Sequence, residues 1–225
     1  MWNNQKQSII WEIKNMYKLF YAEGSASMGI RVLLEELRVP YELIKSTINM
    51  DEPRPSEQIE INPNGWIPVL IGDESIYEAA AITIYLCDKH SSVGLAPKAE
   101  QNTRGLYLQT LVYFSNSVQN AFQLTYYPDR FSHNTDGFES AIKRGISRLY
   151  ETWKVVDDQI GKNVWVLGDE FSAVDIYLFM LTTWLKQSIG HPSVQEFPNV
   201  ARIAFKVARR AATKRVYGSP LSIDG

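Results

Sequence analysis

Hydrophobic and polar positions follow two different patterns along this chain, and the change comes near His90. Before it, short strand-like runs alternate with helical periodicity. The strand-like runs are residues 17–21, 41–45, 69–71 and 75–77, and the helical runs are 27–37, a short segment before Asn62, and 78–89. This order predicts a βαβ unit followed by a ββα unit, and hence an α/β domain.

After His90 the strand-like alternation stops and long amphipathic segments take over. Helices are predicted near residues 99–126, 138–159, 172–187 and 198–209. A segment containing Ser, Gly and Pro, residues 91–98, reads as a linker. The chain is therefore divided into an N-terminal extension (1–15), an α/β domain (16–90), the linker (91–98) and an all-α domain (99–225).

Composition narrows the class of protein. The 225 residues are 45% hydrophobic, enough for a sizeable core, and the net charge of −2 gives no field that would favour nucleic acid. No apolar run is long enough to cross a membrane, and residues 1–15 do not read as a secretory signal. The single cysteine, Cys87, lies in an apolar run and suits packing in a reducing, cytoplasmic compartment.

None of the three histidines has a metal-like spacing to another ligand. His90, His133 and His191 each read most simply as a loop residue, so we expect no metal site.

The most informative motif is Asn62-Pro63-Asn64-Gly65-Trp66-Ile67-Pro68-Val69-Leu70. Pro68 cannot donate to a strand ladder, so it must begin a strand or lie at an edge. This leaves the main-chain groups of Ile67 free for a peptide-shaped ligand, and an X-Pro bond is also the bond for which the cis form is accessible. The alternative is that Pro68 merely ends a loop.

This segment resembles the glutathione-binding half of the glutathione transferases, whose pattern is N-P-x-G-x-[VI]-P-x-L, then a hairpin and an acidic residue that opens a helix. The resemblance extends from Met16 to about Val207. It implies the glutathione transferase fold, with a thioredoxin-like first domain and an all-α second domain. It also implies that Ile67, before a cis Pro68, pairs main chain to main chain with the cysteinyl part of glutathione.

The resemblance gives the neighbouring positions roles as well. Glu78 would hold the γ-glutamyl ammonium group, and the amide of Ala79 would face the γ-glutamyl carboxylate at a helix N-terminus. The family usually has a hydroxyl at the position of Ala79 and often a lysine or glutamine at that of Trp66, near the glycine end of glutathione. Both departures point to weak glutathione binding.

Catalysis in this family needs a hydroxyl or thiol that stabilises the glutathione thiolate at the start of the first helix. Ser27 lies four residues before Arg31, a spacing seen in serine-type members, and Ala26 occupies the place of the thiol in cysteine-type members. Ser27 is therefore the favoured donor and Ser25 the second candidate. Tyr21 is a weaker candidate for the donor hydroxyl. Both serines could instead serve only as caps of the helix N-terminus.

Two further segments belong to the second domain. Tyr113 and Tyr126 lie on the long helix predicted there and are the best candidates for lining a hydrophobic substrate pocket. The alternative is that they pack in the core, as aromatic residues at helical spacing usually do. We expect core packing for Trp153 and Trp184. Ser172 and Asp175 form a capping-box pattern, which we interpret as structural.

The resemblance implies a cytoplasmic homodimeric enzyme of detoxification that conjugates glutathione to small hydrophobic electrophiles. A glutathione-dependent lyase or ether-cleaving enzyme with an aromatic substrate would use the same thiolate. A non-catalytic interaction module that keeps the fold is the third possibility, and Ala79 and Trp66 favour it.

Overall fold

The structure is a computed structural model and describes residues 16–49 and 51–218. The predicted extension, 1–15, lies outside these residues. The chain forms two compact units that divide between Val93 and Gly94, within the segment expected to be a linker. Across the described ranges, no helix combines the length and apolar character needed to span a membrane.

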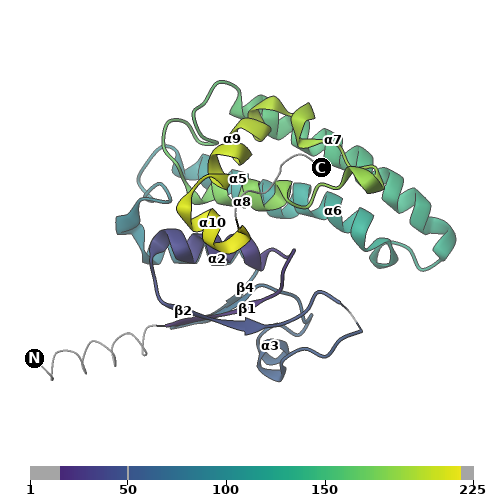
Figure 1. Cartoon of the computed structure of the whole chain (residues 1–225), viewed down its shortest axis with the longest axis horizontal. Coiled ribbons are helices and arrows are strands. Elements are labelled where there is room, and N and C mark those ends of the chain that lie inside the picture. The colour runs from purple at the N-terminus through teal and green to yellow at the C-terminus, as the bar shows by residue number, and fades with distance from the viewer. Residues whose placement is uncertain (1–15, 50, 219–225) are drawn as a thin grey trace, which may run out of the picture. The chain divides into compact units, whose positions relative to one another are not determined.

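Unit 1 contains a four-stranded mixed sheet (Figure 1). Its strands are β1 (Tyr17–Tyr21), β2 (Tyr41–Lys45), β3 (Val69–Ile71) and β4 (Ser75–Tyr77). Their order is β2-β1-β3-β4; β1 and β2 are parallel, and the other two pairs are antiparallel. The helices are α2 (Ser27–Leu37), α3 (Ser56–Ile61) and α4 (Ala79–Lys89), followed by the short 3-10 turn η1 (Ser91–Val93). The five runs predicted at 17–21, 27–37, 41–45, 69–71 and 75–77 are confirmed.

The core of unit 1 lies between the sheet and two of its helices. Leu19 and Phe20 of β1 and Leu70 of β3 have no exposed surface, and neither have Leu34 of α2 and Ile82 of α4. Figure 1 shows α2 and α3 on opposite sides of the sheet. Cys87 is buried and forms no disulfide with another described residue, so its predicted packing role is confirmed.

All the named secondary-structure elements of unit 2, within its described residues, are helical. Its main helices are α5 (Arg104–Tyr113), α6 (Gln119–Tyr126), α7 (Phe138–Ile160), α8 (Ala173–Thr182), α9 (Pro198–Ala208) and α10 (Ala211–Tyr217). The π-helical segment η2 (Phe114–Val118) joins α5 to α6, and four short 3-10 turns complete the unit: η3 (Pro128–Arg130), η4 (Thr135–Gly137), η5 (Gln187–Ile189) and η6 (Val194–Glu196).

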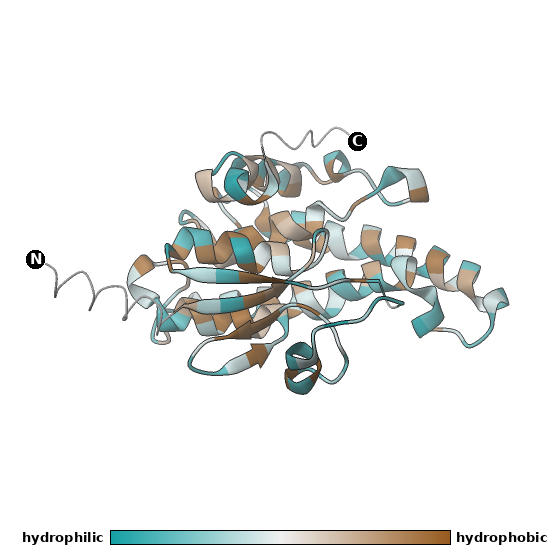
Figure 2. Cartoon of the chain, turned by 60° about the horizontal axis from the view of Figure 1, so that its bottom comes forward, coloured by the Kyte–Doolittle hydropathy of each residue, from teal (hydrophilic) through white to brown (hydrophobic). Residues whose placement is uncertain are grey.

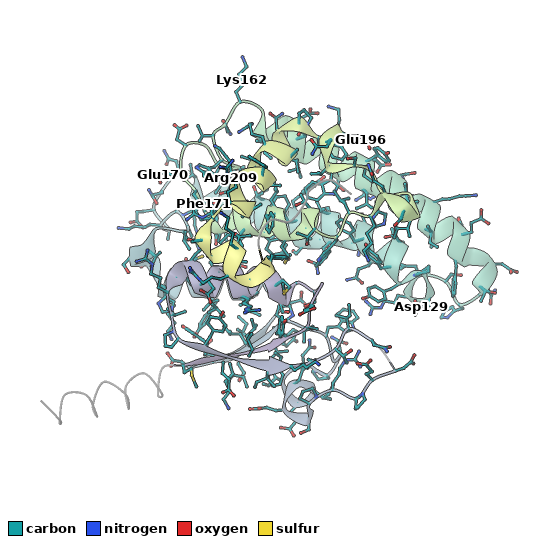
Figure 3. All side chains as sticks on the ribbon, viewed as in Figure 1. Asp129, Lys162, Glu170, Phe171, Glu196 and Arg209 are labelled. Carbon is teal, nitrogen blue, oxygen red and sulfur yellow. The ribbon has the colours of Figure 1, made fainter. Side chains whose placement is uncertain are left out.

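Burial explains how these helices pack. The helix α8 is buried at every position from Ala173 to Leu181. The helix α7 is amphipathic: it buries one face and carries polar residues on the other (Figure 2). A Cβ atom at Gly145 of α7 would come within 2.7 Å of Thr125 and 2.8 Å of Leu124, so glycine permits the close approach of α6. Lys162, just beyond α7, projects away from the helices (Figure 3).

Two carboxylates cap helices in unit 2. Ser172 and Asp175 form the predicted capping box at α8. Burial raises the pKa of Asp175 to about 6, although the hydrogen bonds from Val166 and Ser172 act to lower it. Asp157 of α7 accepts the amides of Asn199 and Val200 at 2.7 and 2.9 Å, and so caps α9 from a neighbouring helix.

Two helix predictions in the second half differ from the structure in their bounds. The helix expected over 99–126 begins at Arg104, and its central residues form the π-helical segment η2 between α5 and α6. The helix expected over 172–187 ends at Thr182, and α10 was not expected at all. Trp153 is fully buried, as predicted, and the Trp184 ring packs edge-on against Phe122.

His191 does lie in a loop, as predicted, but it is a buried structural residue. Its Nδ1 accepts the Lys186 amide at 3.2 Å and its Nε2 lies 2.9 Å from Thr125 Oγ1. Burial lowers the pKa of His191, so the ring is neutral and Nε2 carries the proton.

Candidate active site

Strand register brings the predicted glutathione-binding segments of unit 1 to one edge of the sheet. Phe20 pairs with Val69, so the residues that follow β1 lie beside Ile67 and Pro68. Val69 pairs with Tyr77, which puts Pro68 opposite Glu78. The loop before α2, the Ile67-Pro68 peptide and the start of α4 therefore meet at this edge.

The loop before α2 holds the two serines around the main chain of Ala22. Ser25 Oγ and Ser27 Oγ are 2.7 Å apart, and both hydroxyls lie within donating distance of the Ala22 carbonyl, at 2.8 and 3.2 Å. The amide of Ala22 donates to Ser27 Oγ, and the amide of Ser27 donates to Ser25 Oγ. Each hydroxyl is thus held by several partners at the N-terminus of α2.

The two serines differ slightly in their exposed surface. Ser27 has no exposed surface, whereas Ser25 keeps 6%. Ser27 begins α2 and its side chain lies among buried neighbours on that helix. Both serines are therefore buried, and the choice between them as the hydroxyl that contacts a ligand stays a prediction.

Tyr21 ends β1 at the same edge. Its hydroxyl donates to Glu23 at 3.4 Å, and burial raises the tyrosine's pKa. The Arg31 guanidinium lies 5.6 Å from the Tyr21 ring centroid. The role of Tyr21 as a possible donor to a ligand stays a prediction.

The Ile67-Pro68 peptide is cis, as the resemblance implied. Ahead of it, the side chains of two buried residues hold the main chain: Asn62 Nδ2 donates to the Trp66 carbonyl at 3.0 Å, and Gln58 Nε2 donates to the Gly65 carbonyl at 2.8 Å. The motif already contained Asn62, but sequence reasoning missed Gln58. Its only signal was a polar residue within a short helix.

Glu78 has an unusual backbone. It has φ +72° and ψ 114°, outside the regions that a side chain normally allows, and its side chain is exposed. Strain of this kind in a non-glycine residue persists mainly where function requires it. Ala79 follows as the first residue of α4, whose first amides have no acceptor within the helix.

Trp66 and Arg54 lie beside this edge. Trp66 is 40% exposed, and Gly65 before it has φ +71°. A Cβ atom at Gly65 would lie 3.1 Å from Arg54 Cδ and 3.1 Å from Ile59 Cδ1, so the Arg54 side chain packs against this turn. Sequence reasoning did not identify Arg54, the cation that packs closest to the Gly65 turn.

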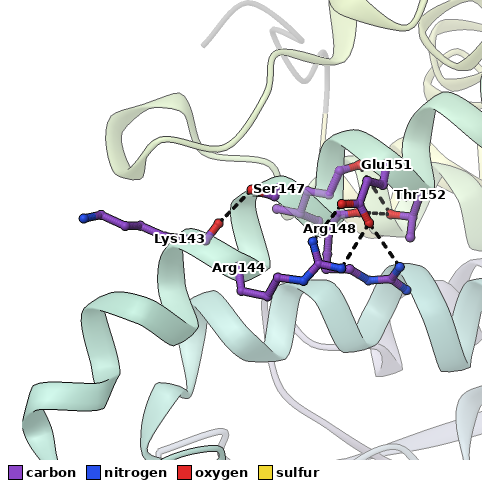
Figure 4. A network of polar contacts seen from close by, with 7 residues as sticks. Lys143, Arg144, Ser147, Arg148, Glu151 and Thr152 are labelled. Carbon is purple, nitrogen blue, oxygen red and sulfur yellow. Dashed lines mark hydrogen bonds and ion pairs between the residues drawn. The ribbon is translucent and has the colours of Figure 1, made fainter.

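Tyr113 and Tyr126 belong to unit 2, and their role in a substrate pocket stays a prediction. Tyr126 donates to the Trp184 carbonyl at 2.6 Å, and burial raises its pKa to about 12, so its hydroxyl is already engaged. Burial raises the pKa of Tyr113, and the nearby charges of Arg148 and Glu151 on α7 have smaller, opposite effects on it. Glu151 bridges Arg144 and Arg148 there (Figure 4).

The described residues contain no group of three or more His, Cys, Asp or Glu side chains that could hold a metal ion. His90 instead pairs with Tyr17 at 2.9 Å, at the opposite end of β1 from the serines.

Comparison with known proteins gives the same family for both units. Residues 25–89 match the family model described as the glutathione S-transferase N-terminal domain, and residues 139–203 match that of the glutathione S-transferase C-terminal domain. The chain is 29% identical over 196 residues to glutathione S-transferase F10 of Arabidopsis thaliana, which covers 82% of this chain and 88% of the relative. It is also 25% identical over 207 residues to the disulfide-bond oxidoreductase YfcG of Escherichia coli, covering 88% and 93%.

Solved structures agree on the fold. A glutathione transferase homolog from Sulfitobacter, solved with bound glutathione, matches with a TM-score of 0.81 at 22% identity and covers 90% of this chain and 97% of its own. The predicted fold class is therefore confirmed. The two family models together match more than half of the chain, and we conclude that it belongs to the glutathione S-transferase family.

Proposed function

We propose that this chain binds glutathione at the sheet edge of unit 1 and transfers it to small hydrophobic electrophiles. The observation that carries the proposal is the convergence of three elements at that edge: a hydroxyl pair at a helix N-terminus, a cis-proline peptide and a strained, exposed carboxylate. The solved relative with bound glutathione supports the ligand class.

Each part of glutathione has a partner at this edge under the proposal. The main chain of Ile67 pairs with the cysteinyl residue, Glu78 binds the γ-glutamyl ammonium group, and the amides at Ala79 face the γ-glutamyl carboxylate. Trp66 and the Arg54 guanidinium lie on the side of the glycyl carboxylate, where arginine can compensate for the lysine absent at position 66.

We assign Ser25 as the hydroxyl that donates a hydrogen bond to the glutathione thiolate, and Ser27 as the hydroxyl that supports Ser25. When Ser25 turns its proton to sulfur, Ser27 can donate to Ser25 Oγ across their 2.7 Å contact, which strengthens the outer hydrogen bond. A charge-assisted hydrogen bond contributes about 1.5–3 kcal/mol, which lowers the pKa of the bound thiol by about one to two. The N-terminus of α2, which has no acidic residue in its first turn, acts in the same direction.

The bound thiolate then attacks an electrophilic carbon. A C–S bond forms, and the leaving group departs with its bonding electrons, or a proton from water completes an addition. Cleavage of an aromatic ether by the same thiolate differs only in the leaving group. Ala26 leaves no thiol in this loop for a mixed disulfide between protein and glutathione.

Two variants test the donor. Wild type, Ser25→Ala and Ser27→Ala are titrated calorimetrically with glutathione and assayed with an activated chlorodinitrobenzene across pH. We expect all three to bind glutathione, and we expect Ser25→Ala to lose turnover at neutral pH and recover it at high pH, where free thiol ionises. Absence of glutathione binding by the folded wild type would overturn the proposal and favour a non-catalytic module.

Partners and location follow as proposals from family membership. We infer a homodimer, and the exposed apolar residues Leu106 and Val112 of α5 suit a surface that a second copy covers. The buried Cys87, the single cysteine of the chain, is compatible with a reducing cytoplasm.

A further inference from the structure

The short helix α3 is attached to unit 1 through a polar residue. Gln58 is the one buried residue of α3 and has no exposed surface. Helices normally bury apolar side chains, and a buried primary amide is retained where its hydrogen bonds are satisfied. The arrangement therefore raises the question of what the Gln58 amide holds.

Both ends of that amide have partners. Ser46 Oγ donates to Gln58 Oε1 at 2.6 Å, and Gln58 Nε2 donates to the Gly65 carbonyl at 2.8 Å. Ser46 follows β2, and its own amide donates to the Tyr21 carbonyl at 2.8 Å. A continuous path of hydrogen bonds thus runs from the end of β1, just before the serine loop, to the turn before Ile67.

A second amide acts on the next peptide. Asn62 is 3% exposed, and its Nδ2 donates to the Trp66 carbonyl at 3.0 Å. Because a peptide group is planar, fixing the Trp66 carbonyl also fixes the direction of the Ile67 N–H on the same plane. Gln58 fixes the preceding peptide, so two successive peptide planes before the cis bond are held by buried side chains.

We propose that Gln58 is a positioning residue for glutathione binding. It holds the Gly65-Trp66 peptide so that the Ile67 main chain stays in register with the cysteinyl backbone, and through Ser46 it ties this turn to the serine loop. An apolar side chain at position 58 would leave the Gly65 carbonyl and the Ser46 hydroxyl without a partner inside the fold. The turn would then rotate to satisfy them and would carry the Ile67 peptide with it.

Substitutions at position 58 separate this role from simple packing. Gln58→Met keeps length and volume but removes both hydrogen bonds. Gln58→Glu keeps the acceptor for Ser46, but its carboxylate faces the Gly65 carbonyl until it is protonated. Tyr17→Phe is the matched control, since it removes one side-chain hydrogen bond, to His90, at the other end of β1.

The experiment is a calorimetric titration of each folded variant with glutathione between about pH 4 and about pH 8, a range that includes the reference carboxyl pKa of about 4.3. The inference rests on the proposed function. We expect Gln58→Met to bind about tenfold or more weakly at every pH, and Tyr17→Phe to bind like wild type. For Gln58→Glu, we expect affinity relative to wild type to be low at high pH and to recover as the introduced carboxyl is protonated, a change that lost packing would not produce.

The possible results distinguish the two proposals. If wild type binds and Gln58→Met matches it within about twofold, the positioning role is overturned while glutathione binding stands. If wild type itself does not bind, the proposed function falls and the positioning role falls with it. Should Gln58→Met fail to fold, the pH dependence of Gln58→Glu decides, and a constant ratio to wild type would refute the inference.

Discussion

Replacing Glu78 by glycine should make unit 1 more stable and glutathione binding weaker. Glu78 has φ +72° and ψ 114°, a conformation that glycine adopts freely and other residues do not. Its side chain is exposed, so its removal deletes few packing contacts. The same residue supplies the carboxylate that we assign to the γ-glutamyl ammonium group.

The two effects can be estimated separately. Strain at such a residue costs of order 1–3 kcal/mol, and the extra freedom of glycine in the unfolded chain offsets about 0.5–1 kcal/mol of the relief. The net gain in unfolding free energy is about 1 kcal/mol or slightly more, or roughly 2–4 °C in Tm for a chain of this size. Loss of a charge-assisted hydrogen bond of about 1.5–3 kcal/mol weakens glutathione binding about 10-fold to 100-fold.

Thermal unfolding and glutathione titration of three variants test this reasoning. Glu78→Gly should gain Tm and lose affinity, whereas Glu78→Ala should lose affinity without the gain. Arg38→Gly is the matched control: Arg38 has φ +56° at the C-cap of α2, so glycine should raise Tm there and leave affinity unchanged. A Glu78→Gly protein that gains stability yet binds glutathione like wild type would refute the assignment of the carboxylate.

Three other predictions concern unit 2. Burial lowers the pKa of His191, so the unfolded chain binds more protons than the folded chain, and the stability of the fold decreases as the pH drops below about 6.5. His191→Gln should reduce this pH dependence of Tm, whereas His133→Gln, at an exposed position, should leave it unchanged. Asp157→Ala should cost about 2–3 kcal/mol in urea unfolding because two amides of α9 lose their acceptor, whereas Asp158→Ala should cost under about 0.5. Val112→Glu, which charges a 54% exposed position on α5, should reduce the proposed dimer to monomers in light scattering.

The sequence predicted unit 1 well because its information is local. Short runs of β-forming residues bounded by turn residues set β1 to β4, and the proline motif fixed the start of β3. The family resemblance identified Glu78 as the acidic residue that opens a helix. Its strained backbone was not predicted, because a single residue joins β4 to α4.

Unit 2 was predicted less well because partners distant in sequence set its boundaries. After α8 ends at Thr182, the chain is held by His191, which bonds the Lys186 amide and, 66 residues away in sequence, Thr125. Periodicity over neighbouring residues contains no trace of such a contact. Asp157, which caps α9 from α7, is the same kind of case: an ordinary acidic residue by sequence.

The choice between the two serines shows how a local pattern could have been used further. Ser27, the first residue of α2, is followed at helical intervals by Ile30 and Leu34, both buried, so it lies on the apolar side of that helix. Ser25 precedes the helix and escapes that periodicity. Motif spacing therefore favoured Ser27, whereas the hydrophobic pattern favours our proposal, in which Ser25 donates to the thiolate and Ser27 is the buried donor behind it.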